Sequence, residues 1–338
     1  MEAANQLPNT NTAPSKWRRL TYLLPLFVAL VVIVTYFIFY KHFLLCSANN
    51  PCSPLTATDI LAGIGTGDET KVSIYVARAS WTLIGGVHVL ACLVAIVTGG
   101  IVIYQALSEY DVKVRWMIVL IAIATAADVS LFVAVWASQD IYSPAQQLLR
   151  ATVGQVLPSI NTNMRIADAL SLTGTLCLAF AACATLWQRD LSKEFDQLQV
   201  LRRVRLLRPV LYVLATTLVI AVLRLSATHA WGASFLPPDT DLAKDLTTLR
   251  AGIVGTLGTF FTLLIAGIYL PAALILRMRL RKVASSQPEP ETWLANNGVS
   301  LSVPDFLTRV IALLAPLLAG PLGELLVSAT SSLGGGGL

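Results

Sequence analysis

One arginine stands inside an apolar stretch, where a charge is costly. Arg224 lies in the run "VIAVLRLSATHAW", which is apolar enough to cross a membrane. An isolated Arg at the centre of a membrane-spanning helix costs about 2.5–3.5 kcal/mol on insertion scales, and such residues normally face a partner or water. The sequence therefore predicts that another polar group holds Arg224 inside a bundle of helices.

Three more ionisable residues lie at matching depths in other apolar runs. We place each by its separation from the tryptophan or arginine that marks the end of its run. A rise of 1.5 Å per residue puts Arg224 about 10 Å below the boundary, with two of the others at about that depth and the third somewhat shallower. We therefore predict one intramembrane polar layer, formed by His88, Asp128, Asp168 and Arg224.

The two carboxylates of this layer are the natural counter-ions for the arginine. We expect Asp128 to pair with it, with Asp168 as a competitor and His88 as a hydrogen-bond partner. A seam of small and polar residues on the same helix face, Thr217, Ala221 and Thr228, would turn the arginine into the bundle. Three interpretations stay open: a structural ion pair, a permeation or proton-handling site, and an arginine that snorkels to the membrane surface.

A second pattern runs along the last apolar stretch, residues 251–276. Small and hydroxyl-bearing residues recur there at alternating intervals of three and four, which places them on one helix face. Such a face lets helices approach closely, and in an oligomer its hydroxyls could instead line a narrow pore. The candidate residues for helix packing or pore lining are Gly252, Gly255, Thr259, Thr262 and Ala266.

The remaining polar residues give no pattern for catalysis. The chain has 3 His residues, without the clustering that zinc or di-iron sites need. It has no P-loop, no G-x-S-x-G and no H-E-x-x-H motif. We therefore expect no enzyme activity, no cofactor and no bound metal.

The cysteines divide into two groups. Cys46 and Cys52 stand close together in a polar segment and are expected to form a disulfide, with two free thiols as the alternative. Cys92, Cys177 and Cys183 fall inside apolar runs and are expected to act as small packing residues.

The composition indicates which kind of structure holds these residues in place. Of 338 residues, 55% are hydrophobic and only 13% are charged, about half the charged fraction of a soluble protein, and the mean hydropathy is +0.69. The net charge of +5 does not indicate nucleic-acid binding, because the positive residues sit at the ends of apolar runs, as membrane topology requires. We predict an all-α polytopic membrane protein with six spans: residues 20–40, 81–107, 116–138, 165–187, 209–231 and 251–276.

The distribution of Lys and Arg predicts the orientation. Fifteen of them lie in segments on the N-terminal side of the membrane and seven on the other, which predicts that both termini are cytoplasmic. The expected organisation is a disordered N-terminus (1–19), a six-span domain (20–283) with a cytoplasmic helical extension of the fourth span (188–208), a polar linker (284–302), an amphipathic segment (303–330) and a flexible tail (331–338). The amphipathic segment is expected to be interfacial or partner-binding, with a re-entrant helix or a seventh span as alternatives.

These features favour a homo-oligomeric channel or pore-forming effector of a bacterial inner membrane. The first alternative is a non-conducting scaffold or sensor that recruits a cytoplasmic partner through its basic helix and tail. The second is a small transporter or redox subunit that uses the polar layer. The expected partners are membrane lipids, further copies of the chain and a cytoplasmic protein, but not nucleic acid.

Overall fold

The structure is a computed structural model that describes residues 23–39, 68–137, 159–187, 197–237, 240–297 and 307–319. In this part of the chain the regular secondary structure is helical throughout. Five of its helices are long and apolar enough to cross a membrane, judged by length and composition. An all-helical architecture with several potential membrane spans is therefore confirmed.

The five long helices correspond to the second through sixth predicted spans. The first predicted span contains α2, Leu24–Phe39, whose 16 residues rise about 24 Å and fall short of the roughly 30 Å hydrocarbon core. Residues 20–22 and 40 lie outside the described part, so the sixth span stays a prediction. The long helices are α4 (Asp68–Ala106), α5 (Val112–Ala137), α7 (Ser159–Leu186), α8 (Gln197–Ala233) and α9 (Asp241–Ala284).

Three of these helices are much longer than a bilayer requires. α4, α8 and α9 contain 39, 37 and 44 residues, which corresponds to roughly 55–65 Å of helix. In α8 the additional length is the basic segment that we expected to continue the fourth span. Instead, α7 ends at Leu186, and from Gln197 onward this segment forms the first turns of the fifth span, while residues 188–196 lie outside the described part.

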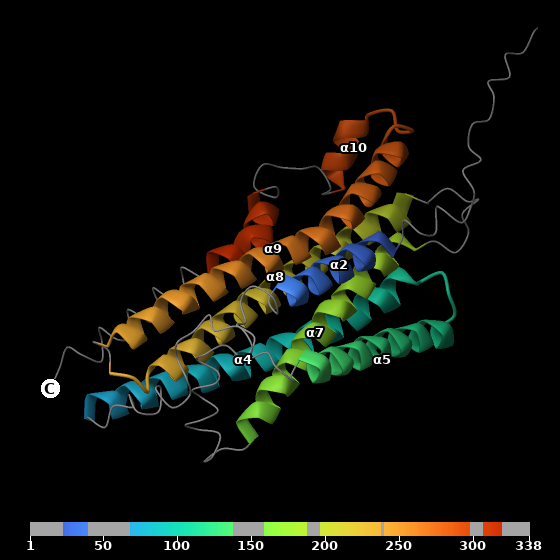
Figure 1. Cartoon of the computed structure of the whole chain (residues 1–338). Helices are drawn as coiled ribbons and strands as arrows, with labels where there is room; N and C mark the ends of the chain where they lie inside the picture. Colours follow the sequence, from blue (N-terminus) through green and yellow to red (C-terminus); the bar gives the residue numbers. More distant parts are fainter. Residues whose placement is uncertain are drawn as a thin grey trace, which may run out of the picture.

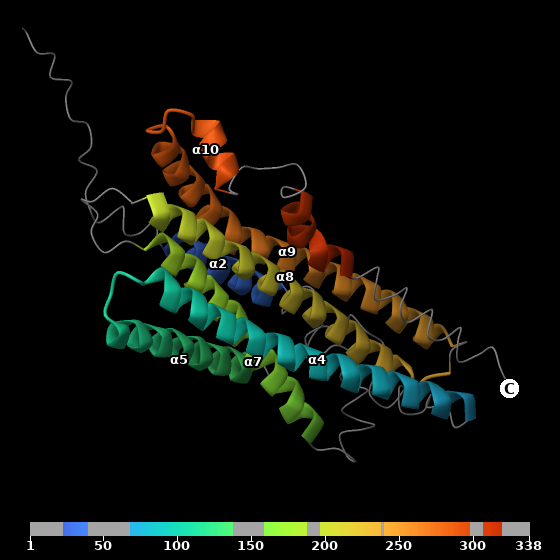
Figure 2. The same cartoon turned by 180° about the vertical axis from the view of Figure 1, so that it is seen from behind.

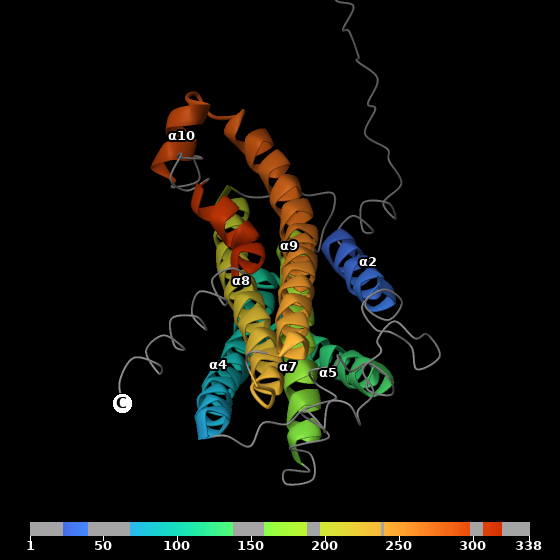
Figure 3. The same ribbon diagram turned by 60° about the vertical axis from the view of Figure 1, so that its left-hand side comes forward.

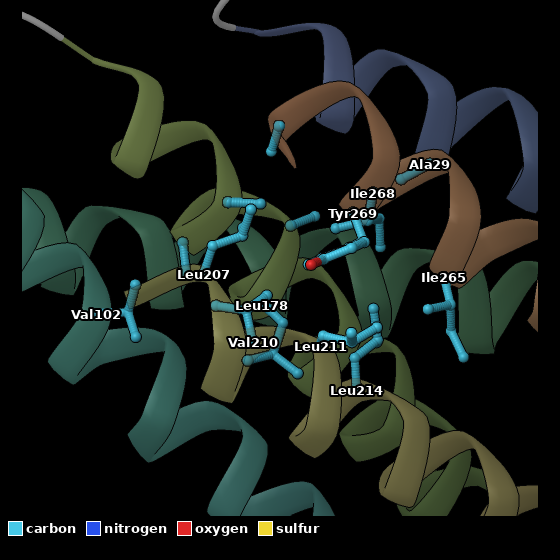
Figure 4. Packing of buried hydrophobic residues seen from close by; sticks show 14 of the residues in the cluster. Ala29, Val102, Leu178, Leu207, Val210, Leu211, Leu214, Ile265, Ile268 and Tyr269 are labelled. Carbon is cyan, nitrogen blue, oxygen red and sulfur yellow. The ribbon is translucent and has the colours of Figure 1, made fainter. Parts of the chain in front are cut away.

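The bundle is built around α4, α7, α8 and α9. α4 packs against α7 and α8, α8 packs against α9, α5 lies on α7, and α2 lies mainly on α9 (Figures 1 and 2). Figure 3, which views the bundle closer to its long axis, places α2 and α5 on one side and α4 on the other. Leu178, Leu211, Leu214 and Ile265 belong to the large core cluster that joins α7, α8 and α9 (Figure 4).

A close helix crossing joins α4 to α7 through small residues. A Cβ atom placed on Gly99 would lie 2.9 Å from the carbonyl oxygen of Cys177, and one on Gly174 would lie 3.1 Å from the Cβ of Ala95. Each helix therefore presents a glycine at the point where the other approaches, as is common in membrane bundles. This crossing sets how α4 and α7 face each other.

The cysteines inside the helices behave as predicted. Cys92, Cys177 and Cys183 are all buried free thiols. Cys46 and Cys52 lie outside the described residues, so their disulfide stays a prediction.

A further apolar helix, Leu307–Ala319, packs against the spans. At Gly258 of α9 it approaches so closely that a Cβ would lie 2.6 Å from the carbonyl oxygen of Pro316. Its last residue, Ala319, shares a core cluster with Val254 of α9. This helix therefore packs on α9, and the interfacial, re-entrant and seventh-span interpretations all stay predictions. The rest of the segment 303–330 is not described.

Two arginines cap the C-terminal end of α7. Arg203 of α8 donates to the carbonyl oxygen of Thr185 at 3.3 Å and pairs with Glu109 at 3.0 Å. Arg279 of α9 donates to the carbonyl oxygen of Leu186 at 3.0 Å. These cations satisfy carbonyls that have no partner within their helix and oppose the negative end of the helix dipole. From the sequence, both arginines are visible only as topology markers, and nothing in it indicates this capping role.

Gly99→Ala should destabilise the bundle, because the added methyl group meets the backbone of α7. We expect a loss of about 1–3 kcal/mol, the usual cost of overpacking, seen as a lower midpoint of thermal unfolding in detergent. The matched control is Gly86→Ala on the same helix, where no described atom lies within 4 Å of the added carbon. Equal midpoints for the two variants would contradict the close crossing.

Candidate functional site

Arg224 is held by a carboxylate from another helix. Its guanidinium group forms an ion pair with Asp168 of α7. The side chain of Arg224 is 14% exposed, whereas that of Asp168 is 60% exposed, so the arginine lies inside the bundle and the carboxylate lies at its edge. The predicted seam on α8 is confirmed, because Thr217, Ala221 and Thr228 are all buried.

His88 joins this pair from α4. It is completely buried, and its Nε2 atom lies 3.6 Å from the sulfur of Cys92, one turn further along the helix. Ser171 of α7 contacts the Cys92 thiol. The polar layer is thus formed where α4, α7 and α8 meet.

Two tryptophans border the layer. Trp81 of α4 donates from its indole nitrogen to the hydroxyl of Thr228 at 3.2 Å, and this hydroxyl donates to the carbonyl oxygen of Arg224 at 2.8 Å. The rings of Trp81 and Trp231 lie 5.0 Å apart. In the sequence these tryptophans mark only the membrane boundary, and nothing there indicates this direct link between α4 and α8.

Asp128, the counter-ion that we preferred, does not join the layer. Ala126 and Ser130 of α5 are completely buried and face the bundle. Asp128 lies two residues from each of them, or about 200° around a helix with 3.6 residues per turn, and it is exposed on the opposite face. The prediction placed this residue by its position along the helix and ignored its direction around the helix axis.

The layer contains buried polar atoms that have no hydrogen-bond partner among the described residues. Nδ1 of His88 and Nε of Arg224 are both buried, and neither has a hydrogen-bond partner in the described part of the chain. Such atoms usually meet water or a solute when they have no protein partner. No group of three or more His, Cys, Asp or Glu residues in the described segments could hold a metal ion.

The small face predicted on the last span is open at Gly252 and Thr259, whereas the hydroxyl oxygen of Thr262 is buried. Gly252 and Thr259 are exposed, and Gly255, Thr262 and Ala266 are half-buried. No described atom lies within 4 Å of a Cβ placed on Gly252 or Gly255. These two glycines therefore do not serve packing within the described chain.

We expect Asp168→Leu to be the more damaging change in the ion pair, because it leaves the buried Arg224 without a partner. The loss should be about 2.5–3.5 kcal/mol, the cost of one unpaired charge in a membrane span. Arg224→Leu should cost less, since the carboxylate left behind is more exposed. The double variant should recover most of the loss.

Thermal unfolding of the purified variants in detergent measures these differences. Asp128→Leu serves as the control, and its midpoint should match that of the native chain. A double variant as unstable as Asp168→Leu alone would show that the two residues do not form a pair.

The chain was also compared with known proteins. No protein-family model matches it, and neither the curated proteins nor the solved structures contain a match. Its function must therefore be argued from the arrangement of its own residues.

Proposed function

We propose that the chain forms a homo-oligomeric channel in a membrane, assembled through the outward face of α9. The observation that carries this proposal is the open space around Gly252 and Gly255. A glycine inside a helix costs about 0.8–1.0 kcal/mol relative to alanine. The described part of the chain gives no packing reason for either glycine, whereas the close approach of a helix from a second copy would give one.

Hydroxyl groups lie beside these glycines. Thr256 donates to the carbonyl oxygen of Gly252 at 2.8 Å, and Thr259 donates to that of Gly255 at 3.0 Å. Because each hydroxyl proton is used within its own turn, the oxygens keep lone pairs that can face a neighbouring helix or a permeating ion. In a ring of copies the same face would recur around the symmetry axis, and its hydroxyls would line a narrow pore.

The proposal includes a location. The bias of Lys and Arg supports a multi-pass topology with both termini in the cytoplasm, and the proposed location is a bacterial inner membrane. Membrane lipids and further copies of the chain are then its partners, and the proposed activity is passive conduction rather than catalysis.

One observation favours a second candidate, a scaffold or sensor that recruits a cytoplasmic protein. Arg202 of α8 and the end of α9 near Arg277 and Arg281 expose positive charge. The short helix α10, Pro290–Asn296, packs on the same helix ends through Trp293. An acidic partner could bind this basic surface without any conduction.

The channel proposal predicts two separable effects on α9. Gly255→Leu should disrupt the oligomer, because a large side chain prevents close approach of the helices. Thr259→Leu should leave the oligomer intact and lower the unitary conductance at least several-fold. Oligomer mass in detergent and single-channel recording in planar bilayers measure the two effects, with Val97→Leu on the exposed face of α4 as the control.

A monomeric native protein, or an oligomer that carries no current, would contradict the channel. An oligomer without current that binds a cytoplasmic protein through Arg202, Arg277 and Arg281 would favour the scaffold. If Gly255→Leu assembles normally, the α9 face is not the contact between copies.

A further inference from the structure

α5 is the span that the rest of the chain covers least. A smaller share of its apolar window is buried than in any other long helix of the described chain. Its outward face is large and mostly apolar, and within the apolar stretch only Thr125 and Asp128 among its exposed described residues are polar. The apolar residues exposed on α5 include Met117, Leu120, Ile121, Leu131 and Phe132.

Asp128 lies well inside the apolar part of this helix. The candidate span is Val112–Val133, and Asp128 stands about 24 Å along it from Val112. A carboxylate at such a position is expensive to expose to lipid and normally faces a partner or water. Asp128 forms no hydrogen bond or ion pair within the described residues.

The cations of the described chain do not provide that partner. Arg115 of α5 lies about 20 Å from Asp128, toward the start of the helix, where it hydrogen-bonds the carbonyl oxygen of Tyr110. Arg224, the cation of the polar layer, is engaged by Asp168 and turned into the bundle.

We propose that the outward face of α5 docks a membrane-spanning helix of a different protein, one that carries a Lys or Arg within its span. The apolar residues of α5 would supply the contact area, and Asp128 would supply an ion pair that selects for the cation. A second copy of this chain fits less well, because Arg224 is already paired and mostly buried, and Arg309 of the apolar helix Leu307–Ala319 is engaged by Tyr269 of α9. The proposal does not depend on the α9 contact or on conduction.

A synthetic transmembrane peptide provides a defined probe. The peptide is a Leu/Ala helix of about 20 residues with one central Lys, and its partner in the comparison carries Leu at that position. In phosphatidylcholine vesicles, energy transfer between labelled peptide and labelled full-length protein reports association. We expect the Lys peptide to bind about 5–30-fold more tightly, the factor that corresponds to about 1–2 kcal/mol for a polar contact between membrane helices.

Variants at Asp128 test whether this residue is responsible for the preference for the Lys peptide. Asp128→Asn should reduce Lys-peptide binding to the level of the Leu peptide, and its thermal midpoint should be unchanged, because the carboxylate has no described partner to lose. Asp128→Lys should transfer the preference to a peptide with a central Glu.

Three results would overturn the proposal. The first is equal binding of the Lys and Leu peptides, or binding that Asp128→Asn leaves unchanged. The second is a clear loss of stability in Asp128→Asn, which would place the partner of Asp128 within its own chain. The third is energy transfer between two differently labelled copies of the protein that disappears in Asp128→Asn, which would make a second copy the occupant of this face.

Discussion

The pairing of Arg224 with Asp168 is the constraint that fixes how the central helices face one another. A membrane interior offers little hydrophobic force to orient one apolar helix against another, so packing and polar contacts must do so. Because an unpaired arginine is costly there, α8 must turn Arg224 toward a carboxylate, and α7 must present Asp168 at that depth. His88 of α4, completely buried beside them, extends the same layer to the third helix.

Small residues make this arrangement sterically possible. α4 and α7 approach closely at Gly99 and Gly174, and the same interface contains Cys92. Without these side chains of minimal size, the backbones could not come close enough for Cys92 to meet Ser171 of α7. The polar contacts select the orientation of the helices, and the close crossing holds it. At the opposite end of α7, Arg203 and Arg279 complete the arrangement by capping its free carbonyls.

The sequence predicted those features that depend on position along a helix. Apolar length identified the helices, and depth brought His88, Asp168 and Arg224 into one layer. The prediction for Asp128 was wrong because depth says nothing about direction around the helix axis. α5 turns Ala126 and Ser130 inward to pack, which leaves Asp128 on the outward face. The contact between Trp81 and Thr228 could not be predicted either, since it depends on which helices become neighbours. For the small face of α9, the residue pattern was visible, but the sequence did not indicate that Gly252 and Thr259 are exposed while the hydroxyl oxygen of Thr262 is buried.

Exchange of the two charges tests the central pairing most directly. In the variant Asp168→Arg with Arg224→Asp, the ion pair is reversed but retained, so yield and thermal midpoint should exceed those of either single change and approach those of the native chain. The matched exchange at Asp128, Asp128→Arg with Arg224→Asp, should give no such recovery. Recovery in the Asp128 exchange and not in the Asp168 exchange would contradict this account and would assign Arg224 to α5.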